Sequence, residues 1–269
     1  MKTFFFLASL MILFFACRKD KDNNNKQLYL SKVFADGLLE TEYFYDADKK
    51  AYRRNDYTTN NGVSSYYGFR LYEYNSNQLL ETITRFSKDN GFISKSKIQY
   101  DANKQPTRMD DLASDNSLLY YHIFDYNLQG DFSKSSTFNG VTNKKVGEKN
   151  FSYNNHKLTK IIQLDYANNP PTKFDSSTYS FNNKPLPSNY FETFLFASLP
   201  NGDRTFVDMS LDSSFYYFVD APPITNRATF SGKQYNGEGY LIKQHFNYKK
   251  TNVFGPATID LDRTYEYIE

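Results

Sequence analysis

A short unit, in which an aromatic residue is followed by Asn or Asp, recurs along most of this chain and limits the folds it can adopt. The copies begin at Tyr45, Tyr74, Tyr100, Tyr126, Tyr153, Phe181 and Tyr235. The first six copies are 29, 26, 26, 27 and 28 residues apart, and the last gap of 54 residues is two periods of 27, which predicts a degenerate copy near Asp208. A fixed period in this range indicates a repeated supersecondary unit.

The chemistry of the unit is that of a β-hairpin. Asn and Asp tolerate the left-handed backbone region and hydrogen-bond their own backbone, so they suit the turn, whereas Tyr and Phe suit the strand end. A period of about 27 residues holds two strands, one tight turn and one return connection. No helical stripe of usable length interrupts the pattern. We therefore predict an all-β antiparallel meander of roughly 14–16 strands in hairpin repeats, curled into a barrel or a strongly coiled sheet.

The N-terminal segment carries a targeting signal. Residues 1–16 place Lys2 before a nearly continuous apolar run, which is too short to span a bilayer and is typical of a secretory signal peptide. Ala16-Cys17 resembles the last two positions of the lipobox of bacterial lipoproteins, in which the Cys is lipidated. This resemblance implies that Cys17 carries a lipid anchor and that residues 17–27, which are rich in charge and Asn, form a flexible tether.

The charge balance and the number of cysteines limit the classes of partner and the covalent cross-links that the chain can have. Net charge is only +2, with 32 basic and 30 acidic residues mixed throughout, which argues against a nucleic-acid partner. Cys17 is the only cysteine, so the chain has no internal disulfide. Residues 28–269 are predicted to form a single β-repeat domain. Three segments interrupt the repeat with closely spaced prolines, which predicts loops or edge strands there: Pro170-Pro171, Pro185 to Pro187 and Pro222-Pro223. Asn183–Ala228 is therefore expected to be the irregular part of the fold.

The turns resemble the YD-type repeats of bacterial surface proteins. Together with the lipobox and the tether, they make the chain similar to uncharacterised Bacteroidota lipoproteins in a family of unknown function with a porin-like fold. The resemblance covers about Leu28 to Glu269. It implies a β-barrel-like fold and a lipid-anchored position at the outer membrane, on the periplasmic or the cell-surface side, and it implies no activity.

A search for catalytic or metal-binding chemistry finds little. His122, His156 and His245 share no short spacing and match no metal-ligand motif; His156 is expected in a solvated turn and His122 in the core. Carboxylates recur at Asp46/Asp48, Asp110-Asp111 and Asp260/Asp262, where calcium is a weak alternative to a plain turn role. No catalytic residue, metal site or cofactor is predicted.

Three functional hypotheses follow. The favoured one is a non-enzymatic binding or scaffold module of the cell envelope, whose partner is a glycan or an envelope protein, because Tyr-rich surfaces offer rings and hydroxyls together. A hydrolase acting on glycans through an unrecognised pair of carboxylates is the alternative. A membrane-spanning barrel is the third, and charged residues on both faces of many predicted strands argue against it.

Overall fold

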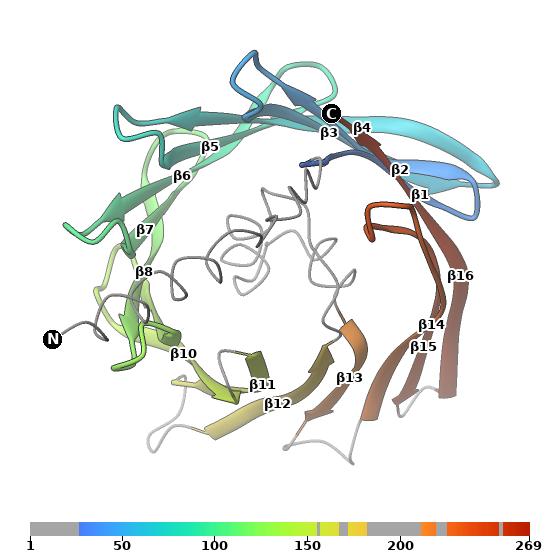
Figure 1. Cartoon of the computed structure of the whole chain (residues 1–269). Helices are drawn as coiled ribbons and strands as arrows, with labels where there is room; N and C mark the ends of the chain where they lie inside the picture. Colours follow the sequence, from blue (N-terminus) through green and yellow to red (C-terminus); the bar gives the residue numbers. More distant parts are fainter. Residues whose placement is uncertain (1–26, 155–156, 167–171, 182–210, 219–224, 253–254) are drawn as a thin grey trace, which may run out of the picture.

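The strands of this protein form a single antiparallel barrel (Figure 1). The structure is a computed structural model that describes residues 27–154, 157–166, 172–181, 211–218, 225–252 and 255–269. Sixteen strands lie within the described residues, and each is paired with its two neighbours in the chain order. They are β1 (Tyr29–Ala35), β2 (Leu38–Tyr45), β3 (Ala51–Asn60), β4 (Val63–Tyr74), β5 (Leu80–Ser87), β6 (Phe92–Tyr100), β7 (Pro106–Leu112), β8 (Leu118–Tyr126), β9 (Phe132–Asn139), β10 (Lys145–Asn154), β11 (Lys157–Asp165), β12 (Thr172–Phe181), β13 (Leu211–Phe218), β14 (Thr225–Tyr235), β15 (Leu241–Asn252) and β16 (Gly255–Ile268).

The predicted antiparallel meander is confirmed, and of the two forms left open by the sequence it is the barrel that forms. The first and last strands close it: β1 pairs with β16 from Tyr29 opposite Ile268 to Ala35 opposite Arg263. The seam continues into the first turn, where the Asp36 amide donates to the Asp262 carbonyl at 2.7 Å and the Asp262 amide donates to the Asp36 carboxylate at 2.8 Å. The described residues contain no helix long and apolar enough to cross a membrane.

The five aromatic–Asx units whose turns the structure describes, at Tyr45, Tyr74, Tyr100, Tyr126 and Tyr235, lie at hairpin turns on one end of the barrel, which we call the Asx end. At Asn75 the backbone amide donates to the carbonyl four residues later, and the side-chain oxygen accepts from the Leu79 amide at 3.0 Å. The fourth residue of the turn, Gln78, has φ of 64°, which Gly or a residue of low steric demand adopts best. The same backbone and side-chain hydrogen bonds recur at Asp46, Asp101, Asn127 and Asn236.

The aromatic residue of the unit is Tyr for a second reason: its hydroxyl ties one hairpin to the previous one. Tyr100 donates to the Leu80 carbonyl at 2.6 Å, and Tyr126 donates to the Pro106 carbonyl at 2.8 Å. Burial raises the pKa of Tyr126 above its usual range, so this donor stays protonated. The equivalent bonds run from Tyr45 to Leu30, from Tyr74 to Ala51 and from Tyr267 to Leu241.

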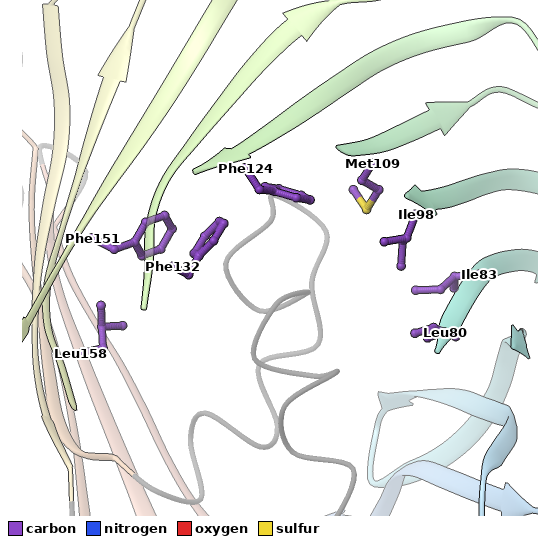
Figure 2. Close-up of a cluster of buried hydrophobic side chains, with 8 residues drawn as sticks. All are labelled: Leu80, Ile83, Ile98, Met109, Phe124, Phe132, Phe151 and Leu158. Carbon is purple, nitrogen blue, oxygen red and sulfur yellow. The ribbon is translucent and has the colours of Figure 1, made fainter. Parts of the chain in front are cut away.

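Apolar side chains pack on the inner face of the wall near the Asx end (Figure 2). The main cluster has side chains 2–8% exposed and comprises Leu80, Ile83, Ile98, Met109, Phe124, Phe132, Phe151 and Leu158. Its rings are in contact, with the Phe132 centroid 5.4 Å from that of Phe124 and 4.6 Å from that of Phe151. A second cluster lies at the closing seam and contains Leu30, Val33, Tyr43, Leu241 and Tyr265. These two clusters form the apolar layer of the inner face.

One expectation about a particular segment needs correction. Asn183–Ala228 was expected to be irregular, but its described parts are strands, because β13 and the start of β14 continue the ladder. Residues 182–210 and 219–224, and the expected degenerate copy near Asp208, lie outside the described residues.

Candidate functional site on the inner face

A polar layer lies directly beyond the apolar layer, farther from the Asx end. Successive inward side chains on a strand are two residues apart. On β4 to β8 this step changes an apolar or aromatic residue into a polar one. On β5 the step runs from Ile83 to Arg85, and on β8 it runs from Phe124 to His122. We define the inner polar layer as Arg54, Asp56, Arg70, Arg85, Ser96, Asp111, His122 and Thr137.

Four of these side chains form one chain of hydrogen bonds across β6, β7, β8 and β9. Ser96 Oγ donates to Asp111 Oδ1 at 2.6 Å, and the other carboxylate oxygen lies 3.1 Å from His122 Nε2. The second ring nitrogen of His122, Nδ1, lies 3.0 Å from Thr137 Oγ1. His122 is only 1% exposed, so the expectation of a core histidine with its hydrogen bonds satisfied is confirmed.

The order hydroxyl, imidazole, carboxylate is the order that activates a nucleophile in hydrolases. Here the ring of His122 is closed to any substrate by its burial, and a second donor, Ser96, holds Asp111. The amides around Thr137 also belong to a strand that is paired on both sides, whereas an oxyanion site needs free donors. The arrangement therefore joins four strands rather than presenting a reactive group.

The other half of the layer is a row of arginines. Arg54 lies opposite Arg70 across the β3–β4 ladder, and Arg70 lies opposite Arg85 across the β4–β5 ladder. Asp56 contacts two arginines of the row, since its carboxylate lies 2.7 Å from Arg54 Nε and 3.1 Å from Arg70 Nε. The Arg54 guanidinium also lies 5.6 Å from the centroid of the Tyr43 ring. Three arginines therefore lie on neighbouring strands in this part of the inner face.

Two exposed tyrosine rings stand above the polar layer. Tyr120 follows His122 and Phe124 on the inward face of β8 and is 43% exposed. Tyr67 is 60% exposed and is the extra residue of a bulge between β3 and β4, next to inward-facing Gly68. Tyr67 is close enough to Arg85 for an electrostatic interaction between the two side chains. Arginines, hydrogen-bonding groups and accessible rings thus occur together on the inner face.

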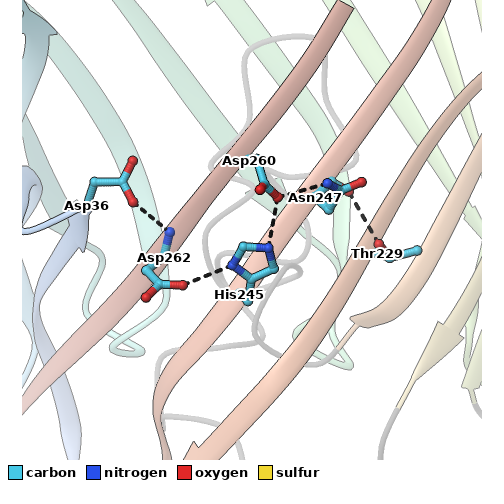
Figure 3. A network of polar contacts seen from close by, with 6 residues as sticks. All are labelled: Asp36, Thr229, His245, Asn247, Asp260 and Asp262. Atoms are coloured by element: carbon cyan, nitrogen blue, oxygen red, sulfur yellow. Dashed lines mark hydrogen bonds and ion pairs between the residues drawn. The ribbon is translucent and has the colours of Figure 1, made fainter.

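A second polar cluster lies on the outer face at the seam (Figure 3). His245 Nδ1 lies 2.9 Å from Asp262 and its Nε2 lies 2.8 Å from Asp260. The hydrogen bond to Asp262, followed by that to Asp260, raises the pKa of His245, although desolvation opposes the shift. Hydrogen bonds from Asn247 and from Lys243, respectively, lower the pKa of Asp260 and of Asp262. In this exposed cluster the carboxylates of Asp260 and Asp262 are paired with the His245 ring and the Lys243 ammonium group.

The carboxylate pairs singled out in the sequence have different positions. Asp260 and Asp262 both contact the imidazole ring of His245. Asp110 and Asp111 face opposite sides of the wall, since Asp110 pairs with Arg108 at 2.7 Å while Asp111 holds His122. Within the described ranges no group of three or more His, Cys, Asp or Glu could hold a metal ion.

Asp46 has the plain turn role, since its side chain accepts from the Lys50 amide at 2.8 Å. His156 and Cys17 lie outside the described residues, so the solvated turn, the lipidation, the signal peptide and the tether stay predictions.

The arginine row and the His122 chain were missed in the sequence because their members are 11 to 16 residues apart and meet only through the register. A signal was present: in each hairpin an inward polar residue stands two positions from an apolar one, as in Met109 and Asp111. Reading both strands of each hairpin at once, with the turn as the fixed point, would have placed Arg54, Arg70 and Arg85 in one row.

Comparison with known proteins supports the fold. No family model matches the chain, and no curated protein matches it significantly. Among solved structures, a porin-like protein from Bacteroides uniformis ATCC 8492 superposes with a TM-score of 0.54 at 10% identity, covering 88% of this chain and 91% of that one. A porin-like protein from Bacteroides vulgatus ATCC 8482 gives a TM-score of 0.41 at 10% identity, with coverage of 89% and 99%. The first likeness shows that the chain has a porin-like barrel fold.

Proposed function

We propose that this protein is a non-enzymatic binding module of the cell envelope that holds a glycan-type ligand on the inner face of its barrel. The observation that carries the proposal is the combination of exposed Tyr67 and Tyr120 rings with the hydrogen-bonding side chains of the inner polar layer. Sugars are bound by stacking on rings and by hydrogen bonds to fixed polar groups. The apolar layer supplies a rigid support below the site.

The envelope location rests on two supports. The N-terminal segment resembles a lipoprotein signal ending at Cys17, and the solved structure with the shared fold is described as a porin-like protein. If Cys17 carries the anchor, the protein should stay in the membrane fraction after a high-salt wash and leave it in detergent. Recovery in the soluble fraction after the salt wash would contradict the anchor.

Charged side chains on the outer face support a lipid-anchored barrel that is surrounded by water, and not a barrel embedded in the bilayer. A membrane barrel carries an outward apolar band about 25 Å tall. Here outward positions of the wall hold charged side chains, such as Lys97 on β6 and the ion pair of Lys243 with Asp262 between β15 and β16. These charges would be costly in hydrocarbon.

A hydrolase is less well supported. Glycosidases need a carboxylic acid whose pKa is raised so that it can donate a proton. Glu148 has a lowered pKa, although burial opposes the shift, because Lys145 and Asn150 hydrogen-bond to its carboxylate; Asp115 has a pKa lowered by Ser117. Asp260 and Asp262 are shifted in the same direction. These four carboxyls are therefore held as anions, the opposite of what a general acid requires.

Binding is best tested by calorimetric titration and thermal melting of the purified protein with neutral oligosaccharides and peptidoglycan fragments, since Trp is absent and cannot report. Tyr67→Ala and Tyr120→Ala should each weaken binding about tenfold. Tyr52→Ala is the matched control, because Tyr52 is 45% exposed and packs on Phe44 at the outer face. No saturable binding by any glycan, or an equal loss in the control, would overturn the proposal.

A further inference from the structure

Four Asn-Gly pairs lie in turns or at strand ends within the described residues. They begin at Asn61, Asn90, Asn139 and Asn236, and a further pair, Asn201-Gly202, lies outside the described residues. In such a pair the backbone nitrogen of Gly can attack the side-chain carbonyl of the preceding Asn, and Gly has no Cβ to hinder the approach. Because the four pairs share the same two residues, the local structure decides which of them is free to react.

In two of the pairs the attacking amide is already engaged in a hydrogen bond. The Gly140 amide donates to the Leu119 carbonyl at 2.8 Å, and the Gly91 amide donates to Ser87 Oγ at 3.0 Å. The side-chain oxygen of Asn139 also accepts from two backbone amides later in its own turn. Reaction at either pair therefore requires that a hydrogen bond of the folded state first be broken.

In the third pair it is the Asn side chain that is held in place. The side-chain oxygen of Asn236 accepts from the Tyr240 amide at 2.8 Å. The backbone of the same turn is closed as well, because the Asn236 amide donates to the Tyr240 carbonyl and the Gly239 amide donates to the Asn236 carbonyl. The side-chain carbonyl would have to leave this arrangement before the next amide could attack it.

The pair Asn61-Gly62 has none of these restraints. Both residues are exposed, and with φ of 51° and 74° they form the two-residue turn between Asn60 and Val63, which pair across the β3–β4 ladder. Within the ranges that the structure describes, neither the Asn61 side chain nor the Gly62 amide makes a hydrogen bond. No atom lies within 4 Å of the point that a Cβ of Gly62 would occupy. The carbonyl and the amide that must react are thus both open to water.

We propose that Asn61 is a site of spontaneous deamidation, with the Gly62 amide nitrogen as the nucleophile. The amide loses its proton to hydroxide and its nitrogen bonds to Cγ of Asn61, which closes a five-membered succinimide. The bond from Cγ to Nδ2 breaks, and the leaving nitrogen takes a proton from water and departs as ammonia. Water then opens the ring at either carbonyl, which yields aspartate or isoaspartate. The net reaction consumes one water and releases one ammonia.

The product changes the end of the barrel that lies away from the Asx end. The turns at Asp46 and Asn75 flank β3 and β4 at the Asx end, so the turn at Asn61 lies at the opposite end. Either product turns a neutral turn into an acidic one. Isoaspartate also lengthens the main chain between Asn60 and Val63 by one carbon, which alters the tip of the hairpin that carries one of the two exposed tyrosine rings of the inner face.

The experiment follows the four pairs in one sample, so that three of them serve as internal controls. Purified protein is incubated at mildly alkaline pH, and peptides are analysed over time by mass spectrometry for the mass gain of deamidation and for separate aspartate and isoaspartate forms. A parallel sample in urea removes the folded-state hydrogen bonds. In the folded protein we expect Asn61 to react at least about fivefold faster than Asn139, the factor that corresponds to one hydrogen bond of typical net strength. In urea the rates at the four pairs should converge.

Asn61→Gln is the matched variant, because attack on the longer side chain must close a larger and slower-forming ring. Glutamine is accepted in the left-handed region elsewhere in this barrel, at Gln78 with φ of 64°. The variant should stay unmodified at this position and keep the parent's rates at the other three pairs. The rate at Asn61 should rise with pH, since the attacking amide must lose its proton.

The inference fails if Asn61 in the folded protein reacts no faster than Asn90 or Asn139. It also fails if the same differences in rate persist in urea, since these would then come from the sequence around each pair and not from the fold. Neither result depends on a bound glycan, so the deamidation site and the proposed binding function can fail separately.

Discussion

Two histidines of this protein each bridge two polar side chains, on opposite faces of one wall. His122 lies between Asp111 and Thr137 on the inner face and is 1% exposed, while His245 lies between Asp260 and Asp262 on the outer face with a side chain 38% exposed. Similar hydrogen bonds have different consequences because water competes for the outer set. The comparison leads us to expect that burial is the main factor in what such a network contributes to stability.

The largest expected effect comes from replacing each histidine in turn and comparing the two losses of stability. His122→Ala should lower the free energy of unfolding by about 3 kcal/mol, because it removes the buried hydrogen bonds to Asp111 and Thr137 and opens a cavity. His245→Ala should cause a much smaller loss, since solvent replaces its hydrogen bonds. Urea unfolding followed by circular dichroism measures both. Equal losses would show that burial does not separate the two sites.

A partly buried hydrogen bond between two uncharged groups tests the effect of burial without a contribution from charge. Tyr100→Phe deletes the hydroxyl that donates to the Leu80 carbonyl at 2.6 Å and keeps the ring. We expect a loss of about 1 kcal/mol, typical of a partly buried neutral bond. Tyr52→Phe is the control, because the exposed Tyr52 hydroxyl makes no hydrogen bond within the described residues. A loss in the control as large as in Tyr100→Phe would assign the effect to the ring environment.

The smallest expected effect is the pH dependence of the outer cluster. The pKa of His245 is raised in the folded protein, so its stabilising contribution is full below its unfolded value of about 6.5 and is lost as pH rises through the folded value. The stability difference between the parent and His245→Gln should therefore shrink from mildly acidic to alkaline pH. It should also shrink in high salt. A difference that stays constant across this range would contradict a charged His245.

Much of the fold could be predicted from the sequence because each hairpin turn depends on residues that are close together in the chain. The turn at Asn75 depends on the side chain of Asn75 itself and on a left-handed Gln78, both within one short stretch. Repetition of such stretches set the strand number and the meander. The choice between a barrel and a coiled sheet could not be made, because it depends on pairing between Tyr29–Ala35 and Arg263–Ile268, at opposite ends of the chain.

The candidate site was less accessible to sequence reasoning. Arg54, Arg70 and Arg85 lie on three strands, and bulges such as the one between Asp56 and Tyr57 shift the register by a residue. A single shift moves every later side chain to the other face. Tyrosine-rich surfaces were foreseen as binding surfaces, but the exposed rings on the inner face could be identified only after the bulges were known.

The tyrosine tethers also have a consequence for folding. Each one runs from a later hairpin back to an earlier one, and the bonded residues are only 15 to 26 positions apart. The sheet can thus grow by short-range steps, each hairpin docking on its predecessor, which favours rapid assembly. The seam is the exception, since Ser31 and Glu266 meet across 235 positions. Until it forms, β1 and β16 are open edges able to pair with other chains, so closure of the barrel is the step that protects the folding protein from aggregation.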